Sequence, residues 1–378
     1  MKIGIITIQK CNNYGADLQA FALQRKLQLM GYDAENIDYL FYKHPEYKKT
    51  RKSRPSFKLS VVNRLKEWLF PKITKLKGLR NRSAVKARQK NFEDFFDNNV
   101  KTSQKYNTID ALYANPPKYD VYITGSDQVW NPRTGASIEP YFLTFAPDGA
   151  KKISYAASFG VASLPPPAYY KYSKWLESYS SISLREANGV RIARQFVGSV
   201  EPVAVCDPTL LLTAEEWKSA AHPVEGMKEG EYLLVYDLNV CPGLWELAHK
   251  WAKKLNLVIV RICRSAGCEN IPGVVNMEAA GPGEFVWLVA NAKAVVTTSF
   301  HGTAFSVIFN RPFYSVIPKG MSNSGRILNL VSMFNLSNRV VNELDCRNVE
   351  LSEDIDNFSN ALELFRAESL NYLETAIG

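Results

Sequence analysis

The sequence predicts an α/β protein that contains two parallel-sheet units in series. Short apolar runs typical of buried strands alternate with amphipathic segments typical of helices along most of the chain. Several of the apolar runs end in polar loop residues that lead directly into a helix, as the strands of parallel sheets do. The contents of 46% hydrophobic and 22% charged residues are those of an ordinary globular protein. No run approaches the ~18 apolar residues that a membrane span needs.

The first series of predicted elements opens with a strand at residues 2–8, a loop, and a helix over Ala16–Met30. Apolar residues on one stripe indicate this helix, and Gly31 is suited to end it. Helices are also expected over about 83–97 and after the prolines at 165–167. Further strands are expected over 37–39, 119–124, 152–157, 181–184 and 203–206.

A second series follows. Its strands are expected over 232–236, 257–262, 294–298 and 313–317, and its helices over 244–255, 282–291, 302–309 and 352–375. We therefore expect an N-terminal domain over 1–212, a C-terminal domain over 213–350, and a C-terminal helix within 351–378. Because polar residues follow the carboxyl ends of the strands, we expect a site in the crevice between the two domains.

The positive charge is concentrated in one insertion of the N-terminal domain. Residues 43–90 contain 17 Lys and Arg against two acidic residues, a net charge of +15, which leaves −6 for the rest of a chain whose net charge is +9. Within the insertion, residues 57–70 carry apolar side chains at helical spacing with basic residues between them. This pattern suits an anionic membrane surface. A helix that packs on a domain with a solvated basic face is an alternative. Single-stranded nucleic acid is disfavoured as a partner, because no nucleic-acid motif accompanies the patch.

The six cysteines are scattered, and only Cys263 and Cys268 are close in sequence. No histidine lies at ligand spacing from them, so we expect buried thiols rather than a metal site. The apolar run at the N-terminus is too short for a secretory signal, and this predicts a cytoplasmic protein, which would lie at the inner face of the membrane if residues 57–70 bind it.

The first loop, Lys10–Gly15, leads directly into a helix. Amides at a helix start attract anions, and Gly15 allows close approach of the backbone. Asn13, Tyr14 and Gly15 are therefore candidate substrate contacts, with ordinary turn chemistry as the alternative.

A second loop, Gly125–Asn131, follows a buried strand and is rich in hydrogen-bonding groups. Ser126, Asp127 and Gln128 offer partners for sugar hydroxyls, and Trp130 offers an aromatic face for stacking. The alternative is a helix cap at Asp127 with Trp130 in the core.

A third junction, Thr297–Gly302, contains His301, which alone among the four histidines lies between a predicted strand and a helix. Its imidazole is suited to proton transfer near neutral pH, although a structural role is the alternative. Arg185 ends another strand, and Arg326 lies in a later loop. Either guanidinium could hold a carboxylate or a phosphate, while pairing with Glu186 is the alternative for Arg185.

Six ordered motifs make the chain resemble the polysaccharide pyruvyl transferase family. The resemblance spans about residues 1–340 apart from the basic insertion. The motifs are Asn12–Gln24, Gly125–Trp130, Ile153–Gly160, Leu184–Glu186, Asp207–Leu211 and Ser299–Gly302.

This resemblance implies a GT-B-like fold: two Rossmann-like domains facing a cleft, with the last helix returning to the first domain. It also implies transfer of an enolpyruvyl unit from phosphoenolpyruvate to a sugar diol, which forms a pyruvate ketal in surface polysaccharide biosynthesis. The donor is a substrate, so we expect no cofactor. The acceptor sugar is expected to be lipid-linked.

For this reaction we hypothesise that His301, Asp127 and Arg185 carry catalysis. Many members carry Arg at the position of Ser299, where a residue helps to hold the donor phosphate. In this chain Arg185, Arg326 or Lys10 would supply that charge, with Ser299 and Arg326 as substrate contacts. Two other functions remain open: a GT-B glycosyltransferase that uses a nucleotide sugar, and a catalytically silent protein that binds sugar or docks on a membrane.

Overall fold

The computed structural model divides the chain into two compact units, and we describe each unit by itself. Unit 1 comprises Met1–Lys72, Phe96–Leu211 and Phe365–Gly378, and unit 2 comprises Ile73–Phe95 and Leu212–Leu364. The structure describes residues 1–40, 44, 46–48, 82–132, 138–264, 268–320, 325–354 and 358–378. Within these ranges, no helix combines the length and the apolar character needed to cross a bilayer.

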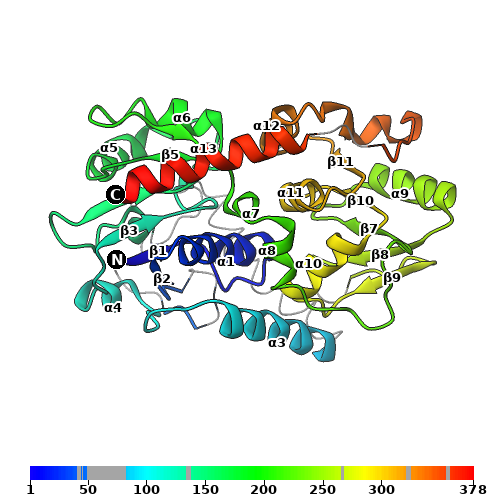
Figure 1. Ribbon diagram of the computed structural model, residues 1–378, viewed down its shortest axis with the longest axis horizontal. Coiled ribbons are helices and arrows are strands. Elements are labelled where there is room, and N and C mark those ends of the chain that lie inside the picture. Colours follow the sequence, from blue (N-terminus) through cyan, green and yellow to red (C-terminus); the bar gives the residue numbers. More distant parts are fainter. Residues whose placement is uncertain are drawn as a thin grey trace. The chain divides into compact units, whose positions relative to one another are not determined.

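The sheet of unit 1 is entirely parallel and has the strand order β2-β1-β3-β4 (Figure 1). A two-stranded parallel sheet, β5-β6, extends it, because bridges from Ile153 to Ser181 and from Ala157 to Leu184 set β5 beside β4. The strands are β1 Lys2–Ile6, β2 Asp33–Asn36, β3 Val121–Thr124, β4 Lys151–Ser154, β5 Ser183–Leu184 and β6 Val203–Ala204. The chain leaves β1 toward β2 on one side and later pairs β3 on the other. This makes the carboxyl ends of β1 and β3 the topological switch point of the sheet, where ligands bind in open α/β sheets.

Helix α1, Tyr14–Leu29, packs against this sheet with most of its residues buried, because Ala, Leu and Phe fill its inner face. The other helices of unit 1 are α4 Ile109–Ala114, α5 Tyr169–Leu176, α6 Ala187–Ala193 and α7 Pro208–Leu211. The last part of α13, Ser359–Ile377, also belongs to unit 1. Its Arg366 donates to the carbonyl of Leu210 at 2.8 Å, and its Tyr372 donates to the carbonyl of Ser154 at 2.9 Å.

The sheet of unit 2 is also parallel and has six strands in the order β12-β11-β10-β7-β8-β9. This is the order of a Rossmann sheet, and its switch point lies between the carboxyl ends of β7 and β10. The strands are β7 Tyr232–Tyr236, β8 Val258–Ile262, β9 Val274–Met277, β10 Ala294–Thr297, β11 Phe313–Ile317 and β12 Val340–Asn342.

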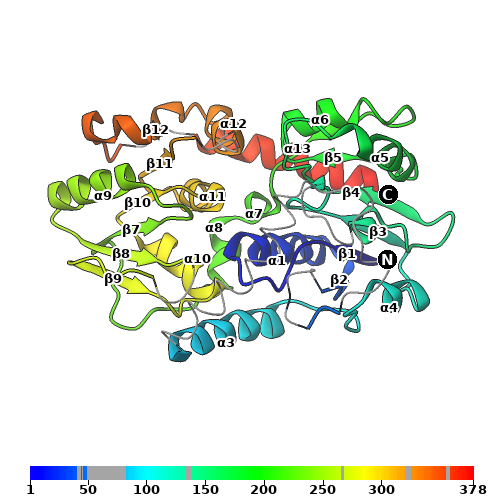
Figure 2. The same ribbon diagram turned by 180° about the vertical axis from the view of Figure 1, so that it is seen from behind.

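Helices cover both faces of this sheet (Figure 2). Leu233 and Val235 of β7 share a core with Trp251 of α9, whereas Tyr236 packs edge-on against Phe285 of α10. Because side chains alternate along a strand, these contacts lie on opposite faces. The helices of unit 2 are α8 Ala214–Lys218, α9 Pro242–Leu255, α10 Pro282–Asn291, α11 Phe300–Ile308 and α12 Gly325–Met333. Short 3₁₀ helices lie at Glu139–Phe142 and Pro166–Ala168 in unit 1, and at Ser337–Arg339 and Glu343–Asn348 in unit 2.

The structure differs from the sequence predictions at several elements. The strand expected over 37–39 lies at Asp33–Asn36, and β9, β12 and α12 were not predicted. Both missed strands are edge strands with partly exposed residues, so they lack the apolar run of a central strand.

Helix α3, Arg82–Asn99, begins in unit 2, although the sequence analysis placed residues 43–90 in the first domain. Arg88 explains the difference, because its guanidinium donates to the carbonyls of Cys263 and Arg264 at 3.1 and 3.2 Å. The proposed membrane-binding segment, residues 57–70, lies outside the described residues.

The expectation of free thiols at Cys263 and Cys268 is wrong, because these two residues form a disulfide. The pair closes the loop after β8, with α-carbons 6.1 Å apart, a separation that a disulfide spans. Cys206, Cys241 and Cys346 are buried free thiols, as expected, and Cys11 is half-buried.

Candidate functional site

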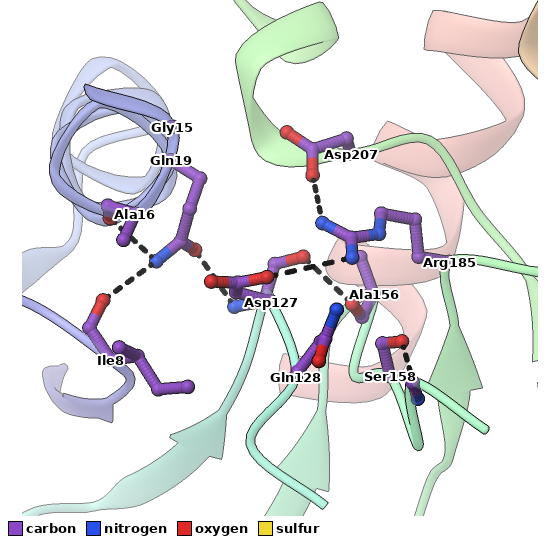
Figure 3. A network of polar contacts seen from close by, with 12 residues as sticks. Ile8, Gly15, Ala16, Gln19, Asp127, Gln128, Ala156, Ser158, Arg185 and Asp207 are labelled. Atoms are coloured by element: carbon purple, nitrogen blue, oxygen red, sulfur yellow. Dashed lines mark hydrogen bonds and ion pairs between the residues drawn. The ribbon is translucent and has the colours of Figure 1, made fainter. Parts of the chain in front are cut away.

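The switch point of unit 1 holds a cluster of one guanidinium and three carboxylates, of which Figure 3 shows Arg185, Asp127 and Asp207. Arg185 follows β5, and its Nη1 lies 2.8 Å from Oδ2 of Asp207, its Nε 2.9 Å from Oε1 of Glu186, and its Nη2 3.5 Å from Oδ1 of Asp127. The Arg185 side chain is 2% exposed, whereas Asp127 and Glu186 keep 18% and 13% of their side chains exposed. The cluster therefore has a formal charge of −2 and presents carboxylate oxygens to solvent.

Electrostatics hold this guanidinium in its charged form. Burial alone would lower the pKa of Arg185, but the charges of Glu186, Asp207 and Asp127 outweigh burial and raise the pKa well above its ordinary value. Asp207 is itself fixed, because its other oxygen accepts hydrogen bonds from the amide and hydroxyl of Thr209 at 3.0 and 2.8 Å. The pairing of Arg185 with Glu186 that the sequence offered as an alternative is present, and Asp207 and Asp127 join it.

The loop that carries Asp127 has positive φ angles at Gly125 and Asp127. Asp127 has a φ of 63°, in the left-handed region that few residues other than glycine adopt. Its carbonyl accepts hydrogen bonds from the amides of Val129 and Ser158 at 2.8 and 3.0 Å. Gly125, with a φ of 117°, lies so close to the next strand that a Cβ there would come within 2.1 Å of the carbonyl of Tyr155. The loop can therefore hold Asp127 at the sheet edge only with glycine at position 125.

Two residues predicted to contact substrate in this loop belong to the interior instead. Trp130 is fully buried, stacks on Phe142 with ring centroids 5.3 Å apart, and donates to the carbonyl of Tyr141. It has no face available to a sugar, so the alternative of a core Trp is correct. Ser126 is also fully buried, and its hydroxyl donates to the carbonyl of Ala156 at 2.7 Å. Both predictions failed because the sequence shows residue types but not which way they point.

Gln128 lies at the edge of this loop and is half-buried. Its Oε1 accepts a hydrogen bond from Asn131 at 2.7 Å. Its side chain points toward the Arg185 cluster in Figure 3. The contact of Gln128 with substrate stays a prediction.

The side chain of Asn13 caps the start of α1, so the first amides of this helix are not open to an anion. The side chain of Asn13 accepts from the amides of Gly15 and Ala16 at 3.0 and 3.4 Å. Tyr14 is buried in the core, which contradicts its assignment as a substrate contact. The ammonium of Lys10 lies 2.7 Å from Asp38, so it already has a carboxylate partner.

Asp17, in the first turn of α1, was missed by the sequence analysis. It is almost completely buried, and burial raises the pKa of its carboxyl to about 7 against the opposing effect of the amides of Lys10, Cys11 and Asn13. The carboxyl thus lies under the loop that precedes α1. A polar residue in a turn otherwise made of small and apolar residues was the signal that could have identified it.

The switch point of unit 2 holds His301. Ser299 caps α11 by accepting the amide of Gly302 at 3.3 Å and is 2% exposed, so its predicted contact with substrate is contradicted. His301 follows in the first turn, keeps 9% of its surface exposed, and packs edge-on against Phe300 with ring centroids 5.1 Å apart. The guanidinium of Arg326, in the first turn of α12, lies over the ring of Phe300, 6.0 Å from its centroid.

The end of β10 fixes the start of α11 by hydroxyl groups. Thr297 donates to the carbonyl of Tyr236 at 2.7 Å, and Thr298 accepts from the amide of Leu238 at 2.9 Å, so the ends of β10 and β7 are tied together. A Cβ at Gly302 would meet Oγ1 of Thr297 at 2.3 Å. Glycine after His301 is therefore required for the helix to start this close to the strand.

Within the described ranges, no group of three or more His, Cys, Asp or Glu side chains is arranged to hold a metal ion. The chemistry-bearing residues are instead the carboxylates around Arg185 in unit 1, and His301 with Arg326 in unit 2.

Comparisons with solved structures place the fold in the GT-B class. UDP-N-acetylglucosamine 2-epimerase from Rickettsia bellii matches with a TM-score of 0.50 and 9% identity, covering 100% of this chain and 97% of that chain. The UDP-GlcNAc 2-epimerase from Methanocaldococcus jannaschii matches with a TM-score of 0.51 and 10% identity, covering 98% and 100%. Arabidopsis thaliana UGT89C1 complexed with quercetin matches with a TM-score of 0.52 and 9% identity, covering 100% and 98%. At these identities the likeness concerns the fold alone.

The family model of polysaccharide pyruvyl transferase matches residues 13–319. The chain therefore belongs to the polysaccharide pyruvyl transferase family, a family of transferases, as its six motifs indicated. Among curated protein sequences, none matches the chain significantly.

The raised pKa of Asp17 predicts a pH-dependent stability. In the folded protein Asp17 holds its proton up to about pH 7, whereas in the unfolded chain it releases the proton near 3.8. Between these values the folded state binds the extra proton, so the free energy of unfolding falls as pH rises toward and through 7, at most by about 1.4 kcal/mol per pH unit.

Urea unfolding of the wild-type protein and of Asp17→Asn at pH 5 and pH 8 measures this effect. The variant cannot titrate at position 17 and should show a flatter dependence on pH, while Asp97→Asn, at an exposed position of α3, should follow the wild type. Identical pH slopes for the wild type and Asp17→Asn would show that Asp17 does not carry the effect.

Proposed function

We propose that this protein transfers the enolpyruvyl unit of phosphoenolpyruvate to two hydroxyls of a sugar, forming a pyruvate ketal and releasing phosphate. Membership of the family supports a transferase acting in polysaccharide synthesis. The observation that carries the proposal is the position of His301 at the switch point of unit 2, with the cation of Arg326 over the neighbouring Phe300. This pairs a proton donor with a positive charge, and the trianionic enol ester needs both.

The proposed reaction balances as follows. The protonated imidazole of His301 gives its proton to C3 of phosphoenolpyruvate, the methylene becomes a methyl group, and C2 becomes an oxocarbenium-like centre. One sugar hydroxyl attacks C2 and loses its proton to Asp127. The C2–O bond to phosphate then breaks, and the second hydroxyl attacks C2. Asp127 passes the proton of the first hydroxyl to the departing phosphate, and the proton of the second hydroxyl restores His301. Both residues end as they began, so no oxidant or reductant is needed.

The electrostatics of unit 1 suit the acceptor rather than the donor. Arg185 is already neutralised by three carboxylates, and the cluster has a formal charge of −2. Such a cluster repels phosphoenolpyruvate, but its exposed oxygens on Asp127 and Glu186 can accept hydrogen bonds from uncharged hydroxyls. We therefore assign Arg185 the role of holding Asp127, and we assign the donor charge to Arg326. The acceptor sugar remains a proposed partner.

Replacing His301 with Asn tests the proton donor. Loss of a general acid should reduce kcat by about 10²- to 10⁴-fold, measured as phosphate release from phosphoenolpyruvate with a panel of nucleotide-linked and lipid-linked hexoses. His249→Asn, at an exposed position of α9, is the matched control and should retain wild-type turnover.

Near-normal turnover by His301→Asn would remove His301 from the mechanism. Thermal-shift measurements distinguish the other functions: stabilisation by UDP-sugars but not by phosphoenolpyruvate would favour a glycosyltransferase. Binding of oligosaccharide without phosphate release under any condition would favour a catalytically silent protein.

Arg326 is tested through the donor. Arg326→Gln should raise the KM for phosphoenolpyruvate by about 10- to 100-fold, because a hydrogen bond to a charged group contributes about 1.5–3 kcal/mol, and should change the KM for the acceptor little. Arg326→Lys keeps the charge and should give an intermediate value. Arg347→Gln, which breaks the exposed ion pair with Glu246, is the control for loss of a surface arginine. An unchanged KM for phosphoenolpyruvate in Arg326→Gln would contradict the assignment.

We also propose that residues 57–70 bring the enzyme to an anionic membrane that carries a lipid-linked acceptor. Replacing Lys58, Arg64 and Lys66 with Gln should weaken binding to vesicles of anionic lipid, because each basic residue near such a surface contributes about 1 kcal/mol. The same replacement at the exposed Lys174, Lys218 and Lys228 changes the net charge equally and should leave binding unchanged. Equal binding by both triple variants would end this part of the proposal.

A further inference from the structure

Gln19 lies at the centre of the hydrogen bonds around the switch point of unit 1. It is completely buried in α1. Its Nε2 donates to Oγ1 of Thr7 at 2.9 Å, to the carbonyl of Ala16 at 2.8 Å and to that of Ile8 at 3.2 Å, while its Oε1 accepts the amide of Ser126 at 3.0 Å (Figure 3). One side-chain amide thus joins the end of β1, the first turn of α1 and the loop after β3, and both its donor and its acceptor ends are used.

The peptide groups of Ser126 are held from two sides. Gln19 accepts the Ser126 amide, and Thr7 donates to the Ser126 carbonyl at 3.0 Å. Because Gln19 also donates to Thr7, the three residues form a closed ring of hydrogen bonds in a buried place. Such a ring is costly to leave partly unsatisfied, so it fixes the backbone of Ser126.

The residue that follows this fixed peptide is Asp127, whose left-handed φ and ion pair with Arg185 set the direction of its carboxylate. We propose that Gln19 is a positioning residue: through the peptide of Ser126 it holds the carboxylate of Asp127 in the orientation that accepts the proton of the sugar hydroxyl. This inference rests on the proposed function, since it assigns a partner to the base of that reaction.

Helix α1 also contains a residue that can serve as a control for Gln19. Gln24 is also a buried glutamine of α1 with both ends of its amide bonded, but it holds the backbone of Lys101, to whose carbonyl it donates at 2.7 Å and whose amide it accepts at 2.9 Å. Within the part of the chain that the structure describes, the hydrogen bonds of Gln24 join it to Lys101 and not to the Asp127 loop. The two glutamines therefore separate a positioning effect from the general cost of changing a buried amide.

Gln19→Glu and Gln24→Glu form the test, with phosphate release from phosphoenolpyruvate as the activity. The glutamate at position 19 keeps the shape of the side chain but loses the two N–H donors. We expect kcat to fall by about 10- to 100-fold at pH 8, the effect of displacing a catalytic group by about 1 Å, with the KM for phosphoenolpyruvate changed less than about twofold. Gln24→Glu should retain most of the wild-type kcat even if its stability falls by the same amount.

Two further readouts distinguish positioning from a merely structural role. As pH falls, protonation gives the glutamate at position 19 one O–H donor and one acceptor, so the ratio of its kcat to that of the wild type should rise. Combined with Asp127→Asn, Gln19→Glu should cause no additional loss, because the group it positions is absent. If Gln19→Glu does not fold, Thr7→Val opens the same ring with a smaller change and should show the same loss of kcat.

Equal loss of kcat in the Gln19 and Gln24 variants, or a full additional loss in the Asp127→Asn background, would overturn the inference while leaving the proposed function intact. A wild-type protein that releases no phosphate with any acceptor would instead overturn the proposed function, and the inference with it.

Discussion

A buried guanidinium needs anionic partners, and this requirement organises the site of unit 1. Arg185 is 2% exposed in its side chain, and Asp207, Glu186 and Asp127 supply the compensating charge from three different loops. Without carboxylate partners this guanidinium would be an uncompensated charge in a place that water hardly reaches. The cluster therefore acts as a fixed point to which the loops after β3, β5 and β6 are fastened, and Asp127 is its most exposed member.

In unit 2, hydrogen bonds between neutral groups, rather than ion pairs, fix the start of the helix that carries His301. The start of α11 is held by neutral hydroxyls: Thr303 donates to the carbonyl of Ser299 at 2.9 Å and contacts Ser315 of β11 at 2.6 Å. Ser306 donates to the carbonyl of Gly302 at 2.8 Å. These bonds fix the first turn, and hence the imidazole of His301, while adding no charge beside it.

Much of the fold could be predicted from the sequence, because buried parallel strands and amphipathic helices leave strong periodic patterns. The same patterns located Asp127, Arg185 and His301 at strand ends. Which side chain faces the core could not be predicted for single residues. Trp130 and Ser126 lie beside Asp127 in the chain and yet are buried, and Ser299 caps a helix. The partners of Arg185 were only partly predicted, since Glu186 is its neighbour in sequence whereas Asp207 is 22 residues away.

The proposed reaction makes opposite electrostatic demands, and we assign them to different sheets. A donor with about three negative charges needs a cation and an acid, whereas the acceptor hydroxyl needs a carboxylate that is free to accept a proton. If both demands were met by one cluster, its cation and carboxylate would pair with each other and neither would be available. In unit 1 the guanidinium of Arg185 is paired with carboxylates in this way, and the carboxylates of the cluster outnumber it. In unit 2 the guanidinium of Arg326 lies over the ring of Phe300, the neighbour of His301 in the sequence. Under the proposed function, the excess of carboxylate around Arg185 is the argument for assigning the acceptor hydroxyls to unit 1.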